Sequence, residues 1–192
     1  MNRWIVRFTQ NIEYWAAANP LVYWLIALYY RDIIRREVRL AEIGPRDHIL
    51  CAGGGPCPFS AILLHQYTGA RVTVIDRDEN CILPARRVLE RLNLSHVIQV
   101  LCHDCSDVEL EDFTVVHLAV QVSPLEQVLR RMRYQALPGT RLLVRTPKAK
   151  LQRLYGGCGA CIDGTDCRAV CHRRTRNIDR TLLFVTEGAF SC

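Results

Sequence analysis

The hydrophobic pattern of residues 47–192 alternates between short apolar runs and longer amphipathic segments. Five apolar runs predict buried β-strands, at residues 48–52, 71–75, 97–102, 113–120 and 140–146. Three amphipathic segments predict the helices between them, at residues 57–67, 79–93 and 123–136. Only one further strand is clear, at residues 181–186. Alternating strands and helices are typical of an α/β fold, so we expect a mostly parallel sheet with helices on both faces.

Residues 1–46 predict helices that precede the sheet. Apolar residues recur there at spacings of three and four, namely Trp4, Ile5, Phe8, Ile12, Trp15 and Ala16. Asn19-Pro20 separates this segment from a second helix, which begins near Leu21 and continues as a charged helix to Glu42. Residues 14–30 carry no charge, but 17 residues interrupted by a proline are short for a membrane span. We expect a helical hairpin that covers the sheet or forms part of a dimer contact.

Three consecutive glycines, Gly53, Gly54 and Gly55, join the first predicted strand to the first predicted helix. Glycine has no Cβ, so it adopts positive φ and lets a ligand approach the backbone closely. Pro56 suits the turn into the helix, because proline is tolerated in a first turn. The N–H groups of the helix N-terminus favour a carboxylate or a phosphate. The stretch predicts a ligand-binding turn, although such a turn also serves as a plain tight connection.

Asp76 ends the second predicted strand, 21 residues after Gly55. In nucleotide-binding βαβ units an acid at about this distance bonds a ribose hydroxyl. The alternative is a helix cap or a solvated strand end. Ligands of such sheets bind at the carboxyl ends of the strands, which here also carry Arg77, Asp104 and Ala119. His117 lies inside an apolar strand, where a lone histidine is usually a satisfied core residue.

The stretch from Gly53 to Leu64, with its Gly-Pro-x-Pro element and the segment Gly69–Asp76 that follows, closely resembles nicotianamine synthase-like proteins of the short archaeal or bacterial type. The resemblance extends from about Asp47 to Thr146. It implies the Rossmann-like class I fold of S-adenosylmethionine (SAM)-dependent methyltransferases, here with a helical extension at residues 1–46 and a SAM-binding domain at residues 47–192. Those enzymes transfer the 3-amino-3-carboxypropyl group of SAM and release methylthioadenosine.

The resemblance also implies roles for individual residues. It assigns SAM binding to the residues around the strand ends, Gly53, Gly54, Gly55, Pro56, Asp76, Arg77, Asp104 and Ala119. Nicotianamine synthases carry a glutamate on the helix before the first strand that takes part in activating the acceptor amine, and Glu37 and Glu42 are the two candidates here. Tyr67 lies one position from a tyrosine of that family. The alternatives are solvated glutamates on a charged helix and a half-buried aromatic ring at a helix end.

Ten cysteines are many for 192 residues, and the N-terminus lacks a signal-peptide pattern. We therefore expect a cytoplasmic protein without a disulfide framework. The close pairs Cys158/Cys161 and Cys167/Cys171 predict a zinc site or an iron–sulfur cluster in a Cys-rich insertion at residues 156–172. Redox-active or disulfide-bonded thiols and plain apolar packing are the alternatives. The pair Cys102/Cys105 could join the site.

Three functions are compatible with these features. The first is transfer of the aminocarboxypropyl group of SAM to a small-molecule amine, which yields a metallophore-type product. The second is methyl transfer on the same scaffold, and the third is a non-catalytic SAM- or metal-binding protein. The net charge of +6 and the eight basic residues without an acid at residues 127–162 suit an anionic partner. No Asn/Asp-Pro-Pro-Tyr motif follows the fourth predicted strand, which argues against one branch of nucleic-acid methyltransferases. A homodimer remains open.

Overall fold

The computed structural model describes residues 14, 15, 17, 19–152, 167–173, 175 and 177–187. Its helices are α2 (Pro20–Ala41), α3 (Phe59–Thr68), α4 (Glu79–Arg91), α5 (Leu125–Gln135) and α6 (Ala149–Gln152). Its strands are β1 (His48–Ala52), β2 (Arg71–Asp76), β3 (Ile98–Cys102), β4 (Val115–Leu118), β5 (Arg141–Pro147), β6 (Arg168–Cys171) and β7 (Ile178–Val185).

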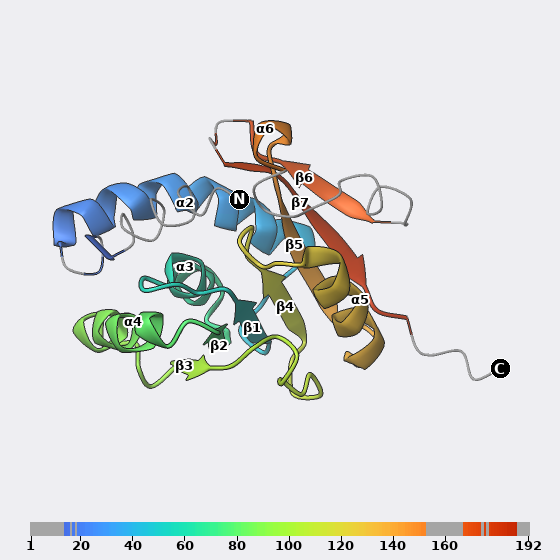
Figure 1. Cartoon of the computed structure of the whole chain (residues 1–192), viewed down its shortest axis with the longest axis horizontal. Coiled ribbons are helices and arrows are strands. Elements are labelled where there is room, and N and C mark those ends of the chain that lie inside the picture. Colours follow the sequence, from blue (N-terminus) through green and yellow to red (C-terminus); the bar gives the residue numbers. More distant parts are fainter. Residues whose placement is uncertain are drawn as a thin grey trace.

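The strands form one seven-stranded sheet in the order β3-β2-β1-β4-β5-β7-β6 (Figure 1). β1 to β5 are parallel to one another, whereas β7 is antiparallel to β5 and to β6. One apolar cluster joins a face of the sheet to α2, α3 and α4, and a second cluster joins the opposite face to α5. The mostly parallel sheet with helices on both faces is therefore confirmed.

The C-terminal part of the chain corrects one prediction. The sequence showed only one further strand, but the structure has an antiparallel pair, β6 and β7. β6 is an edge strand whose four side chains are exposed or half-buried, so no apolar alternation marks it in the sequence. It also lies inside the segment that was expected to be a Cys-rich insertion.

Helix α2 begins and ends at local signals. The side chain of Asn19 caps it by accepting a hydrogen bond from the N–H of Leu21 at 2.9 Å. Glu42 ends it in the left-handed conformation, with φ 52°. Ile34 and Ala41 belong to the core cluster that packs against the sheet, so α2 is part of the same core. None of the described helices is long and apolar enough to cross a membrane.

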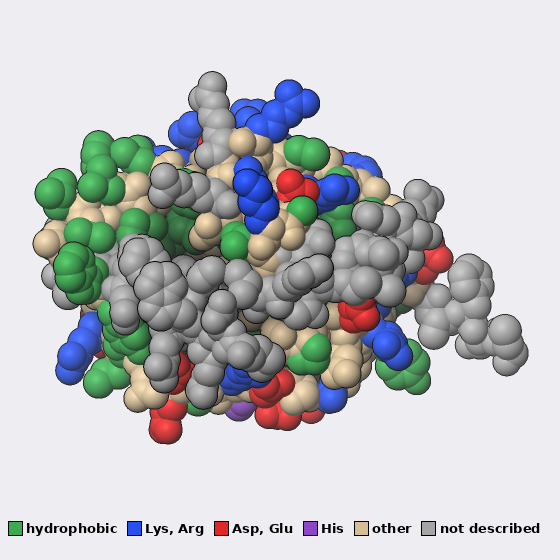
Figure 2. Space-filling model, turned by 45° about the horizontal axis from the view of Figure 1, so that its top comes forward, with side chains coloured by type: hydrophobic (Ala, Val, Ile, Leu, Met, Phe, Trp, Pro, Cys, Tyr) green, Lys and Arg blue, Asp and Glu red, His purple; other side chains and the backbone are tan. Residues whose placement is uncertain are grey.

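The first turns of α2 expose large apolar side chains, including Leu21, Trp24 and Leu25. Figure 2 shows apolar side chains gathered at this end of the molecule, on its left side. A dimer contact through this face remains a prediction.

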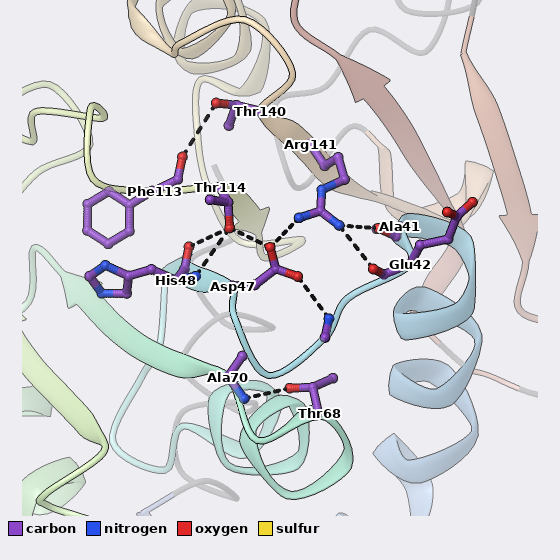
Figure 3. Close-up of polar contacts among 11 residues, drawn as sticks. Ala41, Glu42, Asp47, His48, Thr68, Ala70, Phe113, Thr114, Thr140 and Arg141 are labelled. Carbon is purple, nitrogen blue, oxygen red and sulfur yellow. Dashed lines mark hydrogen bonds and ion pairs between the residues drawn. The ribbon is translucent and has the colours of Figure 1, made fainter.

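Asp47 fixes the end of α2 against the sheet (Figure 3). Its carboxylate accepts hydrogen bonds from the N–H of Gly44 at 2.8 Å and the hydroxyl of Thr114 at 2.7 Å, and it pairs with Arg141. Arg141 also donates to the carbonyls of Ala41 and Glu42, at 2.7 and 3.1 Å. Burial raises the pKa of Asp47, but these donors outweigh burial and hold the pKa below its ordinary value.

Asp47→Asn should therefore lower the free energy of unfolding at neutral pH by about 1–2 kcal/mol. A carboxyl whose pKa is depressed by folding stabilises the protein above its unfolded pKa and loses that contribution as the pH falls toward the folded pKa. The difference between wild type and variant should shrink below about pH 4. Urea unfolding across this pH range measures it, with Asp32→Asn, which breaks an exposed pair with Arg36, as a control costing about 0.5 kcal/mol. A pH-independent difference would contradict the role given to the Asp47 charge.

Candidate functional site

A pocket opens at the carboxyl ends of the parallel strands. Its walls are the turn after β1, the first turn of α3 and the loop at residues 119–121 after β4. Tyr30 of α2 and Phe59 add aromatic surface. Side chains from three neighbouring strands also line it, namely Cys51, His117 and Arg145. A pocket at this edge is where open α/β sheets bind ligands.

The turn requires glycine at its three positions for different structural reasons. Gly53 and Gly55 adopt positive φ, 80° and 63°. A Cβ on Gly54 would lie 2.2 Å from Cγ1 of Val74, so the close approach of the turn to β2 excludes any side chain there. The turn therefore presents bare backbone to the pocket.

Asp76 lies at the end of β2 and supports the turn. Its carboxylate accepts hydrogen bonds from the N–H of Gly55 at 2.8 Å and the N–H of Asp78 at 2.9 Å. An ionised carboxylate has about four acceptor sites, so a ligand hydroxyl can also bind here. Asp78 in turn caps α4. The alternative of a helix cap therefore applies to Asp78, which lies two positions after Asp76.

The N-terminus of α3 faces the same pocket through Phe59, Ser60 and Ala61. Pro58 occupies the cap position and provides no side-chain hydrogen bond, and the first turn carries no acid. The first N–H groups of a helix have no partner within the helix, and they favour a negative charge. The bare turn and this helix start fit the carboxylate of an amino acid moiety.

A buried ion pair lies beneath the pocket. The carboxylate of Glu37, which is 0% exposed, accepts two hydrogen bonds from the guanidinium of Arg145, at 2.8 Å from Nε and 2.7 Å from Nη2. Burial raises the pKa of Glu37, but Arg145 and His117 together hold it well below its ordinary value. Burial lowers the pKa of Arg145, and Glu37 more than offsets that effect. Both groups are therefore charged, in the bidentate geometry that makes such pairs strong.

Further polar groups complete this cluster. Thr181 of β7 donates to Glu37 at 2.6 Å, and its hydroxyl lies 2.8 Å from Nε2 of His172. Arg145 donates to the hydroxyl of Ser60 at 2.9 Å. Nε2 of His117 lies 3.3 Å from the second oxygen of Glu37. The cluster joins α2, α3, β4, β5 and β7 directly below the pocket.

The structure separates the two glutamate candidates. Glu37 is buried in this cluster, so the alternative of a solvated glutamate is wrong for it. Glu42 lies beyond the last turn of α2, where its exposed carboxylate is 3.6 Å from Arg168. Tyr67 lies in the last turn of α3, about 10 Å along the helix from Ser60. Its ring lies 5.2 Å from the guanidinium carbon of Arg35, and it does not line the pocket.

The remaining predicted residues lie around the strand ends. Ala119 lines the pocket, and Pro56 is buried in the turn. Asp104 is half-buried and accepts a hydrogen bond from the N–H of Ser106 at 2.9 Å, which is the main cause of its lowered pKa. Arg77 is exposed. The role of these residues around a nucleoside stays a prediction.

Arg145 was missed in the sequence, and His117 was interpreted only as a core residue. No local signal identifies Arg145, because it is 108 positions from its partner Glu37. His117 is buried, as interpreted, but it also lines the pocket and contacts Glu37. A charged residue and a histidine inside otherwise apolar strands were the only available hints.

The cysteines show no metal site among the described residues, where no three His, Cys, Asp or Glu side chains gather suitably. Cys158 and Cys161 lie outside the described part of the chain. Cys167 directly precedes β6, and Cys171 is its last residue. The metal site at the four cysteines stays a prediction.

Comparisons with known proteins give a clear result for the fold. No protein-family model and no curated protein matches the sequence. Among solved structures, the nicotianamine synthase MtNAS in complex with MTA and tNA matches at TM-score 0.79 and 23% identity, covering 94% of this chain and 72% of that one. The chain has the class I methyltransferase fold. The predicted resemblance to nicotianamine synthases is confirmed at the level of three-dimensional structure.

Methyltransferases with the same fold match over shorter regions. An RNA methyltransferase from Salinibacter ruber in complex with S-adenosylhomocysteine has TM-score 0.63 and 17% identity over 82% of this chain and 92% of that one. A putative O-methyltransferase from Klebsiella pneumoniae has TM-score 0.62 and 14% identity, over 82% and 80%. MtNAS therefore matches a larger share of this chain than these two methyltransferases do.

Gly54→Ala tests the close approach of the turn to β2. The new Cβ must displace Val74, so we expect a loss of about 1–3 kcal/mol in the free energy of unfolding. Gly44→Ala is the matched control, because nothing lies within 4 Å of its added Cβ. Val74→Ala removes the clashing methyl group and should make the double variant more stable than additivity predicts. Additive losses would contradict a clash between these two positions.

A double-mutant cycle tests the buried ion pair. Glu37→Met and Arg145→Met each leave one buried charge without its partner and should cost about 3–5 kcal/mol. The double variant should cost much less than the sum of the two. Glu42→Ala and Arg168→Ala, at the exposed pair, should each cost no more than about 1 kcal/mol. Unfolding curves of the Glu37/Arg145 variants and of the Glu42/Arg168 variants measure these losses in the free energy of unfolding. A small loss in Glu37→Met would contradict a buried ion pair.

Proposed function

We propose that this protein is a SAM-dependent transferase that moves the 3-amino-3-carboxypropyl group of SAM to the amine of a small-molecule acceptor. The observation that carries the proposal is the match to MtNAS over 94% of this chain. The matched MtNAS structure contains MTA, which is methylthioadenosine. Methylthioadenosine is the nucleoside left when the aminocarboxypropyl group departs, whereas methyl transfer leaves S-adenosylhomocysteine.

The residues of the pocket suit SAM as the donor. The glycine turn and the start of α3 would hold its methionyl carboxylate, and Asp76 would bind its ribose. Asp104 and Arg77 would contact the adenine end of the nucleoside. When bound, SAM supplies an electrophilic carbon next to a sulfonium. The protein's part is to hold the acceptor amine in line with that carbon and to provide a place for its proton.

The shape of the pocket supports a small acceptor. Aromatic rings of Tyr30 and Phe59 flank it, and the buried Glu37–Arg145 pair closes it from below. This enclosure supports a small-molecule enzyme rather than a nucleic-acid enzyme, and we propose the cytoplasm as its compartment. A metallophore-type product follows from the likeness to nicotianamine synthases.

Methyl transfer is the alternative, and the likeness to the Salinibacter ruber enzyme favours it. The two reactions differ in which carbon of the sulfonium faces the acceptor. The present geometry of the pocket is compatible with either.

Product identification distinguishes the two reactions. Purified protein is incubated with SAM, alone and with candidate amines that carry a carboxylate, and the nucleosides are separated against an enzyme-free control. We expect methylthioadenosine above that control, together with an aminocarboxypropylated acceptor. S-Adenosylhomocysteine would make the protein a methyltransferase, and neither nucleoside in the presence of bound SAM would remove the enzyme assignment.

A further inference from the structure

The wall of the pocket contains hydrogen-bond donors that the chain itself does not use. Ser60 and Ala61, in the first turn of α3, both line the pocket. The N–H groups of Phe59 and Ile62 donate to carbonyls of the loop before the helix, at 2.8 and 3.1 Å. Those of Ser60 and Ala61 have no acceptor among the described residues. Two free N–H groups at a helix start favour a negatively charged group.

The side chain of Ser60 adds a third donor. Its Oγ accepts a hydrogen bond from Nη1 of Arg145 at 2.9 Å. A hydroxyl can accept and donate at the same time, and no described residue accepts the hydrogen of this one. Ser60 is only half-buried, and it lines the pocket. The O–H group is therefore available to a molecule bound there.

Arg145 fixes the role of this hydroxyl. A guanidinium only donates hydrogen bonds, so Ser60 can accept from Arg145 and never donate to it. Glu37 holds the guanidinium in place through Nε and Nη2, at 2.8 and 2.7 Å, and leaves Nη1 for Ser60. A hydroxyl that accepts from a cation is polarised and becomes a better donor. The buried ion pair thus prepares Ser60 to bind an anion.

No acidic side chain lines the pocket. Its lining residues include one permanent cation, Arg145, and no Asp or Glu. Burial raises the pKa of the Cys51 thiol to about 12, so the thiol is uncharged at pH 7. Burial and Arg145 lower the pKa of His117 and outweigh the opposing effect of Glu37, so the ring is neutral as well. The lining therefore suits an anionic group beside Ser60.

We infer that the Ser60 hydroxyl binds the carboxylate of the methionyl group of SAM, together with the N–H groups of Ser60 and Ala61, and that Arg145 is the positioning residue of this hydroxyl. The site would then select its donor by that carboxylate. Decarboxylated SAM lacks only this group, and it would leave three donors of the pocket unpaired. The inference rests on the proposed function, because it needs SAM as the donor, but it holds for transfer of either group.

Binding of SAM and of decarboxylated SAM to the same protein tests the inference without turnover. Titration calorimetry in the absence of an acceptor gives both dissociation constants. Wild type should bind SAM at least about 100-fold more tightly, because a hydrogen bond to a charged group is worth about tenfold or more. Ser60→Ala should reduce this ratio about tenfold through weaker binding of SAM, with the affinity for decarboxylated SAM within about twofold of wild type. Ser60→Thr keeps the hydroxyl and should restore most of the ratio.

Thr68→Val is the matched control, because it removes a hydroxyl from the last turn of the same helix. That hydroxyl donates to the carbonyl of Leu64 at 2.6 Å, away from the pocket. Both affinities should stay at the wild-type values. The melting temperatures of the Ser60 variants should also stay close to wild type.

The double variant Glu37→Met/Arg145→Met tests the positioning role. A purely structural role would weaken the binding of both nucleosides equally. We expect the ratio to fall about as far as in Ser60→Ala, because the hydroxyl loses its fixed partner.

Two results would overturn the inference alone. One is a wild type that binds SAM and decarboxylated SAM equally tightly, and the other is an equal loss for both ligands in Ser60→Ala. A wild type that binds neither nucleoside would remove SAM as the donor, and the proposed function would fail with the inference.

Discussion

The ion pair between Glu37 and Arg145 is the constraint on which the pocket depends. Two charges removed from water are tolerated only when each satisfies the other with good geometry. Here two hydrogen bonds of 2.8 and 2.7 Å meet that condition, with Thr181 and Ser60 satisfying further groups. Because the partners come from α2 and β5, the pair fixes the helix over the sheet. The N-terminal helix is thereby made part of the site.

Different groups of the pocket have different roles around this ion pair. The glycine turn lets a ligand approach the backbone closely, the start of α3 favours a carboxylate, and Asp76 supports the turn from β2. Arg145 neutralises Glu37, so the floor carries little net charge despite its two ions. His117 contacts the same carboxylate, with its Nε2 3.3 Å from Oε2 of Glu37. The helix start, which favours an anionic group, and the buried ion pair are thus two separate parts of the pocket.

Local patterns predicted much of the fold. The five parallel strands, the glycine turn and Asp76 all follow from short sequence signals, namely apolar runs, missing Cβ atoms and an acid at a strand end. β6 escaped because an exposed edge strand has no apolar period. The partnership of Glu37 with Arg145 and His117 could not be predicted, since it joins residues 80 and 108 positions apart through the strand order. Contacts between residues far apart in the chain depend on the order of the strands in the sheet, which a single sequence does not reveal.

The most direct measurement is a crystal structure with methylthioadenosine bound. The account predicts the nucleoside across Gly53–Gly55, with its ribose hydroxyls on Asp76. Its thioether sulfur should face the side of the pocket where His117 and Arg145 lie, with room there for an amino acid acceptor. A nucleoside bound elsewhere, or a sulfur that faces away from His117, would contradict the assignment of this pocket to aminocarboxypropyl transfer.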